Sequence, residues 1–173
     1  GMLIFFIIQG YGLVSIIFST ASIFVSYIFG YRFIKDLKLL DNDLLSKSWF
    51  KAAIFFNIIS SLGTFYLAYM MVSKNFVQDL YLSSIYYYLH FQYNGFFIFS
   101  CIGFLLFSMK QAGSGISEKQ NKLIFWLLFV GCVIGYGLSV LWMKMPVSIF
   151  AAIVVATIMQ TIGAVLLFVF IKK

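Results

Sequence analysis

The sequence predicts an all-α fold, an integral membrane bundle of five transmembrane helices in one domain that spans residues 1–173. The chain is 63% apolar, and its 12 Lys/Arg and 5 Asp/Glu residues leave the cores of five long apolar runs uninterrupted. Each run reaches the length of about 20 helical residues that crosses a hydrocarbon layer, and none has the polar face of a soluble helix. The runs cover residues 11–33, 48–73, 81–108, 123–143 and 147–171.

Positive charges alternate between the segments that join the runs. The first segment carries five Lys/Arg residues, the third carries three and the C-terminus two, whereas the second and fourth carry only Lys74 and Lys144. Because cytoplasmic loops carry the Lys/Arg excess, we expect the N-terminus outside and the C-terminus in the cytoplasm.

The net charge of +7 has the same origin, since the positive residues flank helices at one interface. Such residues favour contact with anionic lipid head groups. We therefore expect the lipid bilayer as partner, not nucleic acid, in a bacterial cytoplasmic (inner) membrane. Trp49, Trp126 and Trp142 lie near run ends, so we expect their rings at the membrane interface.

The first run is preceded by an apolar segment, residues 2–8. No positive region precedes it and no small-residue cleavage site is evident, so a signal peptide is not expected, and Gly1 has the character of an expression scar. A continuous helix over residues 2–34 would be about 50 Å long and would exceed the hydrocarbon thickness. Either this helix projects outward, or residues 9–12 break it, or the chain is the C-terminal part of a longer protein.

Small residues recur at spacings of three and four in the first and fourth runs. They are Gly12, Ser15, Ser19, Ser22 and Ser26, followed by Gly131 and Gly135. In lipid, small residues allow helix backbones to approach closely. We expect these faces to pack within one bundle or between protomers, so a homo-oligomer and other membrane subunits are both candidate partners.

The third run contains the only histidine, His90, about ten residues and roughly 15 Å from the outer end, near the bilayer centre. Residues three and four apart share a helix face. That face is predicted to hold Tyr86, Tyr87, His90, Tyr93 and Asn94, with Cys101 two turns further on and Gln92 pointing elsewhere. Polar groups at the midplane are costly and suggest a functional site. Asn57 and Gln160 lie at comparable depth, so a cluster with His90 and Asn94 is geometrically feasible.

Two interpretations of His90 stay open. A neutral imidazole satisfied by Tyr or Asn across a helix interface would be purely structural. Alternatively, the density of polar and tyrosine residues favours a site for an apolar or planar ligand, namely haem, quinone or lipid, with His90 as a haem-iron ligand.

The fourth and fifth runs carry ordinary helix-start signals. Ser117 and Gln120 have the spacing of a capping box, and Pro146 stands where a missing N–H costs nothing. Cys101 and Cys132 lie within runs and are expected to be free, buried thiols.

Several chemistries are excluded by composition. No Asp or Glu lies in a run, which removes intramembrane proton relay and cation coupling. One histidine is too few for a zinc site, which takes about three or four ligands, and no phosphate-binding motif is present. We therefore do not expect an enzyme.

Residues 88–97, with the sequence Tyr-Leu-His-Phe-Gln-Tyr-Asn-Gly-Phe-Phe, resemble a segment of bacterial multi-pass membrane proteins that are distantly similar to the haem-copper oxidase catalytic subunit. Residues 60–63 and 67–69 also resemble that group. The resemblance implies a haem- or metal-ligand role for His90 alone. Those oxidases use several intramembrane histidines, so the resemblance implies a fragment, a degenerate relative or a partner subunit.

Three functions follow as hypotheses. The first is a non-enzymatic membrane module or subunit that binds an apolar or planar ligand at a midplane site around His90 and Asn94. The second is a neutral-solute transporter or pore subunit that depends on a continuous polar path. The third is a scaffold or assembly subunit of a membrane complex, which the small-residue faces favour.

Overall fold

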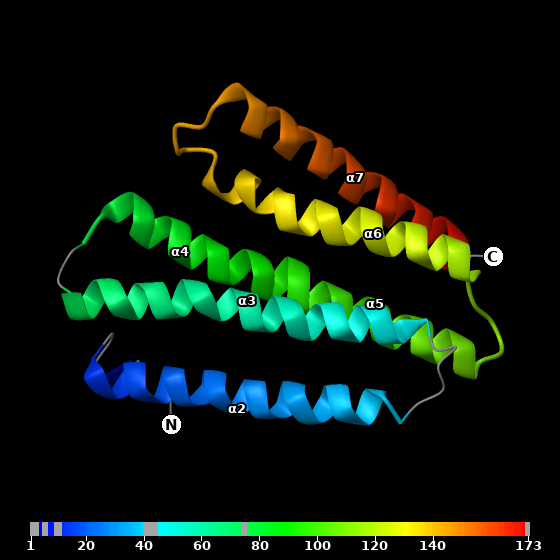
Figure 1. Cartoon of the computed structure of the whole chain (residues 1–173), viewed down its shortest axis with the longest axis horizontal. Helices are drawn as coiled ribbons and strands as arrows, with labels where there is room; N and C mark the ends of the chain where they lie inside the picture. Colours follow the sequence, from blue (N-terminus) through cyan, green and yellow to red (C-terminus); the bar gives the residue numbers. More distant parts are fainter. Residues whose placement is uncertain (1–3, 5–6, 9–11, 40–44, 74–75, 172–173) are drawn as a thin grey trace. The chain divides into compact units, whose positions relative to one another are not determined.

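The structure is a computed structural model that describes residues 4, 7–8, 12–39, 45–73 and 76–171 (Figure 1). Over these residues it contains helices and no strand. Five continuous helical stretches of these residues, two of which combine several of the elements named below, are long and apolar enough to cross a membrane. The elements are α2 (Leu13–Leu37), α3 (Ser46–Ser73), α4 (Gln78–His90), the π-helix η1 (Phe91–Phe97), α5 (Ile98–Gln111), α6 (Glu118–Gly135), the 3-10 helix η2 (Tyr136–Val140) and α7 (Val147–Ile171).

The chain divides into two compact units, residues 1–42 and 43–173, and the prediction of one domain stays a prediction. In the first unit, α2 begins after Gly12, whose backbone is extended with φ −93° and ψ 170°. A continuous helix over residues 2–34 is therefore wrong, while residues 9–11 of the expected break lie outside the described residues. The hydroxyls of Ser15, Ser22 and Ser26 donate to backbone carbonyls three residues earlier, as serine hydroxyls in apolar helices commonly do.

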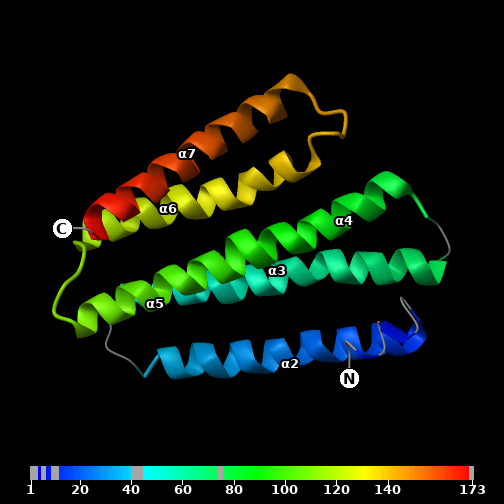
Figure 2. The ribbon, with the colours of Figure 1, turned by 180° about the vertical axis from the view of Figure 1, so that it is seen from behind.

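In the second unit, α3 runs beside one long rod made of α4, η1 and α5, and the α6–α7 hairpin lies along the same rod (Figures 1 and 2). The rod, residues Gln78–Gln111, forms one span of 34 residues. Each predicted run of this unit coincides with a span, and the ends differ by no more than five residues. Most spans extend into polar residues that hydropathy alone leaves out, whereas the fourth ends at Val140, three apolar residues before the predicted end.

The helix ends match the sequence signals. Ser117 Oγ accepts a hydrogen bond from the Gln120 backbone N–H at 3.3 Å, and Gln120 Oε1 accepts one from the Ser117 N–H at 3.0 Å. The predicted capping box at the start of α6 is therefore confirmed. Pro146 directly precedes α7, and its carbonyl accepts the first N–H bonds of that helix.

The core of the second unit lies where α3, α5 and α6 meet, and Trp49 is at its centre. Its ring is completely buried, and the indole N–H donates to Asn121 Oδ1 at 2.8 Å. Trp49 lies in the first turn of α3 and faces the protein interior, where a buried amide on α6 satisfies the indole N–H. Trp126 and Trp142 are about half exposed, and the interfacial depth of the three rings stays a prediction.

Glycines allow the closest helix contacts in this unit. A Cβ added at Gly63 of α3 would lie 2.6 Å from the Ser84 carbonyl oxygen of α4. A Cβ at Gly131 of α6 would lie 2.5 Å from Gln160 Cγ of α7, and one at Gly135 would lie 3.3 Å from Gln160 Nε2. The Gly131–Gly135 face is thus occupied by α7 of the same chain.

Candidate functional site

His90 is the last residue of α4 and is only 7% exposed. Its Nε2 lies 2.9 Å from the carbonyl oxygen of Cys132 on α6. A carbonyl oxygen only accepts hydrogen bonds, so the geometry assigns the ring proton to Nε2. Nδ1 is then the acceptor, and Asn94 Nδ2 lies 3.2 Å from it while Ser139 Oγ lies 3.5 Å away. Both ring nitrogens therefore have partners in the fold.

The Cys132 carbonyl lies in the last turn of α6, just before the chain continues as the 3-10 helix η2. His90 donates to this carbonyl from the neighbouring helix. In a bilayer core backbone polar groups are satisfied within the protein, so this bond joins α4 to α6 at the point where α6 changes geometry.

A second departure from α-helical geometry starts directly after His90. The π-helix η1 places Gly95 against Phe56, where an added Cβ would lie 2.5 Å from the ring. It also directs Gln92 toward α3, where its Oε1 lies 2.9 Å from Ser60 Oγ. The rod thus bonds to α6 through His90 and to α3 through Gln92. Irregular turns of this kind occur frequently at functional sites.

The predicted tyrosine face does not stay together. Tyr87 packs against Tyr136 of η2 with ring centroids 5.1 Å apart, on the same side as His90. Tyr86 packs on Trp142 at 5.0 Å, whereas Tyr93 is 58% exposed and stacks on Phe97.

Cys101 is exposed although His90 is buried, and the expectation of a buried Cys101 on the same face is wrong. The physical reason is the π-helix, which holds more residues per turn than an α-helix. The side chains after it therefore point in other directions around the helix axis than a regular helix would give. Cys132 is buried, and both thiols are free of disulfides as predicted.

Asn94 and Gln160 lie at two different helix interfaces. Asn94 bonds to His90, as described above. The Asn57 carbonyl accepts a hydrogen bond from Ser60 Oγ within α3. The Gln160 side chain covers the glycine face of α6 that is turned toward α7. In the part of the chain that the structure describes, no hydrogen bond joins Gln160 to His90 or Asn94, and the four-residue cluster stays a prediction.

Haem does not fit His90 in this arrangement. An axial ligand needs a free lone pair on a ring nitrogen. Nε2 carries its proton toward Cys132, and the Nδ1 lone pair accepts from Asn94. Among the described residues no group of three or more His, Cys, Asp or Glu could hold a metal ion.

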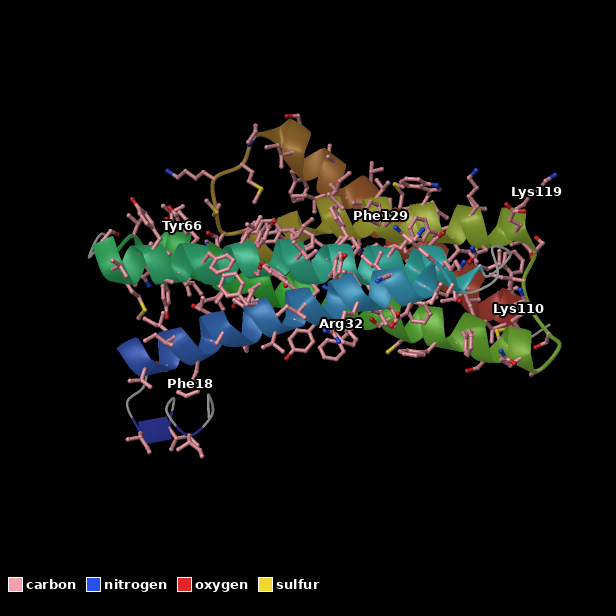
Figure 3. All side chains as sticks on the ribbon, turned by 60° about the horizontal axis from the view of Figure 1, so that its bottom comes forward. Phe18, Arg32, Tyr66, Lys110, Lys119 and Phe129 are labelled. Atoms are coloured by element: carbon pink, nitrogen blue, oxygen red, sulfur yellow. The ribbon has the colours of Figure 1, made fainter. Side chains whose placement is uncertain are left out.

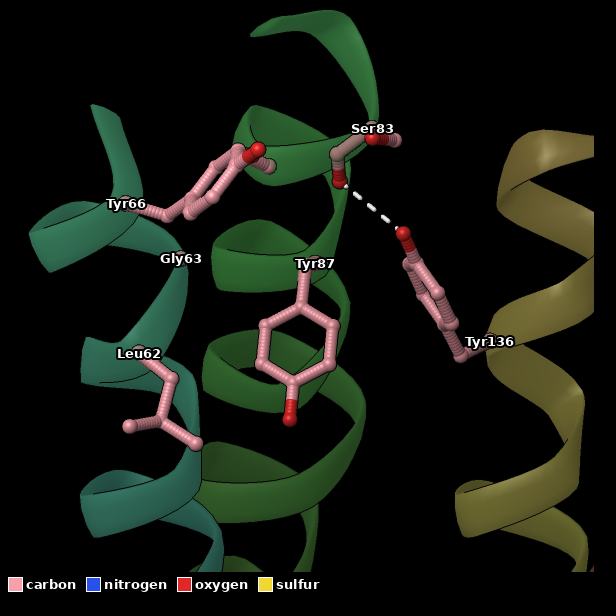
Figure 4. Close-up of a pocket in the computed structure, with 7 residues that line it drawn as sticks. Leu62, Gly63, Tyr66, Ser83, Tyr87 and Tyr136 are labelled. Atoms are coloured by element: carbon pink, nitrogen blue, oxygen red, sulfur yellow. Dashed lines mark hydrogen bonds between the residues drawn. The ribbon is translucent and has the colours of Figure 1, made fainter. Parts of the chain in front are cut away.

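One turn from His90, a groove of about 330 Å³ opens between α3, α4 and η2 (Figure 4). It is lined by Leu62, Gly63, Tyr66, Ser83, Ser84, Tyr87 and Tyr136. The Tyr136 hydroxyl donates to the Ser83 carbonyl at 3.0 Å and joins η2 to α4 across one wall. Figure 3 shows Tyr66 toward the opposite end of the unit from Lys110 and Lys119.

Sequence reasoning found Tyr87 but missed the other groove residues. Tyr66 lies in the second run, for which no packing face was predicted, and Tyr136 follows the small-residue face of the fourth run. Ser83 and Ser84 precede the tyrosine cluster. The available signal was Gly63, because a glycine in a spanning helix marks a close contact between helices.

The chain matches no protein-family model, and no curated protein and no solved structure is significantly similar to it. The resemblance of residues 88–97 to relatives of haem-copper oxidases stays a prediction.

Proposed function

We propose that the chain is a non-enzymatic membrane module or subunit that binds an apolar or planar, lipid-soluble ligand in the tyrosine-lined groove beside His90. The groove carries this proposal. Its volume of about 330 Å³ lies within the range of roughly 300–1,000 Å³ typical of ligand pockets. Three of its seven lining residues are tyrosines, which combine an aromatic ring with a hydroxyl group that can orient a ligand.

Local rigidity supports the same proposal. The wall formed by α4 and η2 is fixed by the Tyr136–Ser83 hydrogen bond and, one turn away, by the His90–Cys132 bond. Gly63 brings α3 against the Ser84 backbone at the opposite wall. A binding site gains affinity when its walls are held in place before the ligand arrives. In this proposal His90 positions the groove and does not contact iron, so quinone and lipid are favoured over haem as ligands.

The proposal includes the orientation expected from the charges. Figure 3 shows Lys110 and Lys119 at one end of the second unit, and Figure 1 shows the first turn of α3, which carries Lys47, at that same end. The turn between α6 and α7, which carries Lys144, lies at the other end. This distribution supports a cytoplasmic position for the lysine-rich end in a bacterial cytoplasmic membrane, with the groove in the outer half. Labelling of single cysteines at positions 114 and 144 in intact cells tests it. Exclusive outside labelling of position 114 would overturn the orientation.

Two other functions receive less support. A neutral-solute path needs continuous polar groups, but the Ser60–Gln92 pair, the His90–Asn94 pair and Gln160 lie at separate interfaces. A scaffold role rests on the small-residue face of α2, which would contact a second copy or another membrane subunit.

The test of ligand binding compares three forms of the protein purified from native membranes in mild detergent. Ser83→Phe fills the groove, and Leu105→Phe adds similar bulk on the exposed face of α5. We expect organic extracts of the wild type and of Leu105→Phe to contain the same apolar compound in stoichiometric amount, and extracts of Ser83→Phe to lack it. Equal extracts from all three forms would refute groove binding.

A further inference from the structure

Of the five hydroxyl groups that line the groove, three donate hydrogen bonds within the described part of the protein and two do not. The Ser83 and Ser84 hydroxyls both donate to the Leu80 carbonyl, at 3.0 and 2.6 Å. The Tyr136 hydroxyl donates to the Ser83 carbonyl. The phenols of Tyr66 and Tyr87 have no acceptor among the residues that the structure describes. The groove therefore presents two phenolic O–H donors whose hydrogens are not used by the protein.

An unused donor in a spanning segment is costly, since the hydrocarbon offers no acceptor. A ligand with acceptor oxygens removes this cost, whereas a ligand that only donates leaves both phenol hydrogens unpaired. The ligand is also neutral, because none of the residues lining the groove is charged. A phosphate or carboxylate head group would find no counter-charge there.

The shape of the site favours a planar ring. The Tyr87 ring stands edge-on to Tyr136 at an interplanar angle of 78°, and Figure 4 shows it between Leu62 and Tyr136. Gly63 contributes no side chain to the lining. Aromatic rings suit offset or edge-on packing with a planar ring. A quinone combines such a ring with carbonyl acceptors and an apolar tail that can extend into lipid.

We infer that the groove takes the ring of a quinone, whose carbonyl oxygen accepts a hydrogen bond from the Tyr87 phenol. Tyr87 is then the residue that determines specificity, and Tyr66 is the second donor. This inference rests on the proposed function. It concerns binding alone and involves no electron transfer.

The experiment uses the full chain, immobilised in detergent, and two labelled probes with the same decyl tail: a benzoquinone and a plain benzene. Tyr87→Phe removes only the hydroxyl, and Tyr86→Phe is the matched control because Tyr86 lies outside the groove. We expect Tyr87→Phe to weaken binding of the quinone probe by about five- to tenfold, the effect of one hydrogen bond. Tyr86→Phe should leave quinone binding unchanged, and the benzene probe should bind both variants equally.

The outcomes separate the two levels of the proposal. If both probes bind with equal affinity to wild type and Tyr87→Phe, and Ser83→Phe blocks both, the groove binds apolar ligands but the quinone inference fails. If an uncharged diacyl lipid displaces the quinone probe and Tyr87→Phe has no effect, the site is a lipid site and the inference also fails. If Ser83→Phe blocks neither probe, the proposed function itself fails.

Discussion

Replacing His90 by leucine tests whether its imidazole stabilises the packing of α4 against the end of α6. The substitution removes the Nε2–H bond to the Cys132 carbonyl and the Nδ1 acceptor of Asn94, and it keeps an apolar side chain of similar size. One interhelical hydrogen bond in a membrane protein contributes about 0.6 kcal/mol on average and at most about 1.7. Leaving a buried carbonyl unsatisfied costs about 1–3 kcal/mol. We therefore expect a loss of about 2 kcal/mol in the free energy of unfolding.

The matched variant is His90→Gln. A glutamine Nε2 reaches a position close to that of imidazole Nε2 and can donate to the same carbonyl. We expect this variant to recover more than half of the lost stability. Reversible unfolding in mixed micelles with increasing sodium dodecyl sulfate gives both free energies. The reasoning is refuted if His90→Leu is as stable as the wild type, or if glutamine is no better than leucine.

Three further predictions follow from close contacts and buried partners. Gly63→Ala should lower the free energy of unfolding by about 1–3 kcal/mol, the range for overpacking, whereas Gly115→Ala, which meets open space, should leave the melting temperature unchanged. Trp49→Phe should lower the free energy of unfolding by about 1–3 kcal/mol, because it leaves the buried Asn121 amide unpaired. The same change at the exposed Trp126 should lower it by less than about 0.5 kcal/mol. Unfolding in dodecyl sulfate compares the two variants, and equal losses would contradict the buried Trp49–Asn121 bond. Haem titration should give no Soret band that depends on His90, and a band present in the wild type but absent from His90→Ala would contradict the assigned tautomer.

The five helices could be predicted because each needs about 20 apolar residues, a constraint that hydropathy reads directly. The capping box at Ser117 could be predicted for a similar reason, since its partners are three residues apart in sequence. Both features depend on local sequence.

The interior could not be predicted in the same way. Lipid-facing and buried surfaces of a membrane protein are nearly equally apolar, so the sequence did not reveal that Trp49 faces the core. The single face assigned to the third run assumed a regular helix, and the π-helix after His90 invalidates that assumption for Tyr93 and Cys101. The groove was missed because three separate elements form it, and only tertiary packing brings Tyr66 and Tyr136 together.

The order of the helices along the chain has a consequence for biogenesis. The helix that carries His90 is synthesised before the helix that carries Cys132, so the imidazole can already be in the membrane when the interrupted helix leaves the translocation machinery. The Cys132 carbonyl then meets the His90 donor on arrival. If the two hairpins were exchanged in the gene, α6 would enter the membrane before the residue that bonds to it.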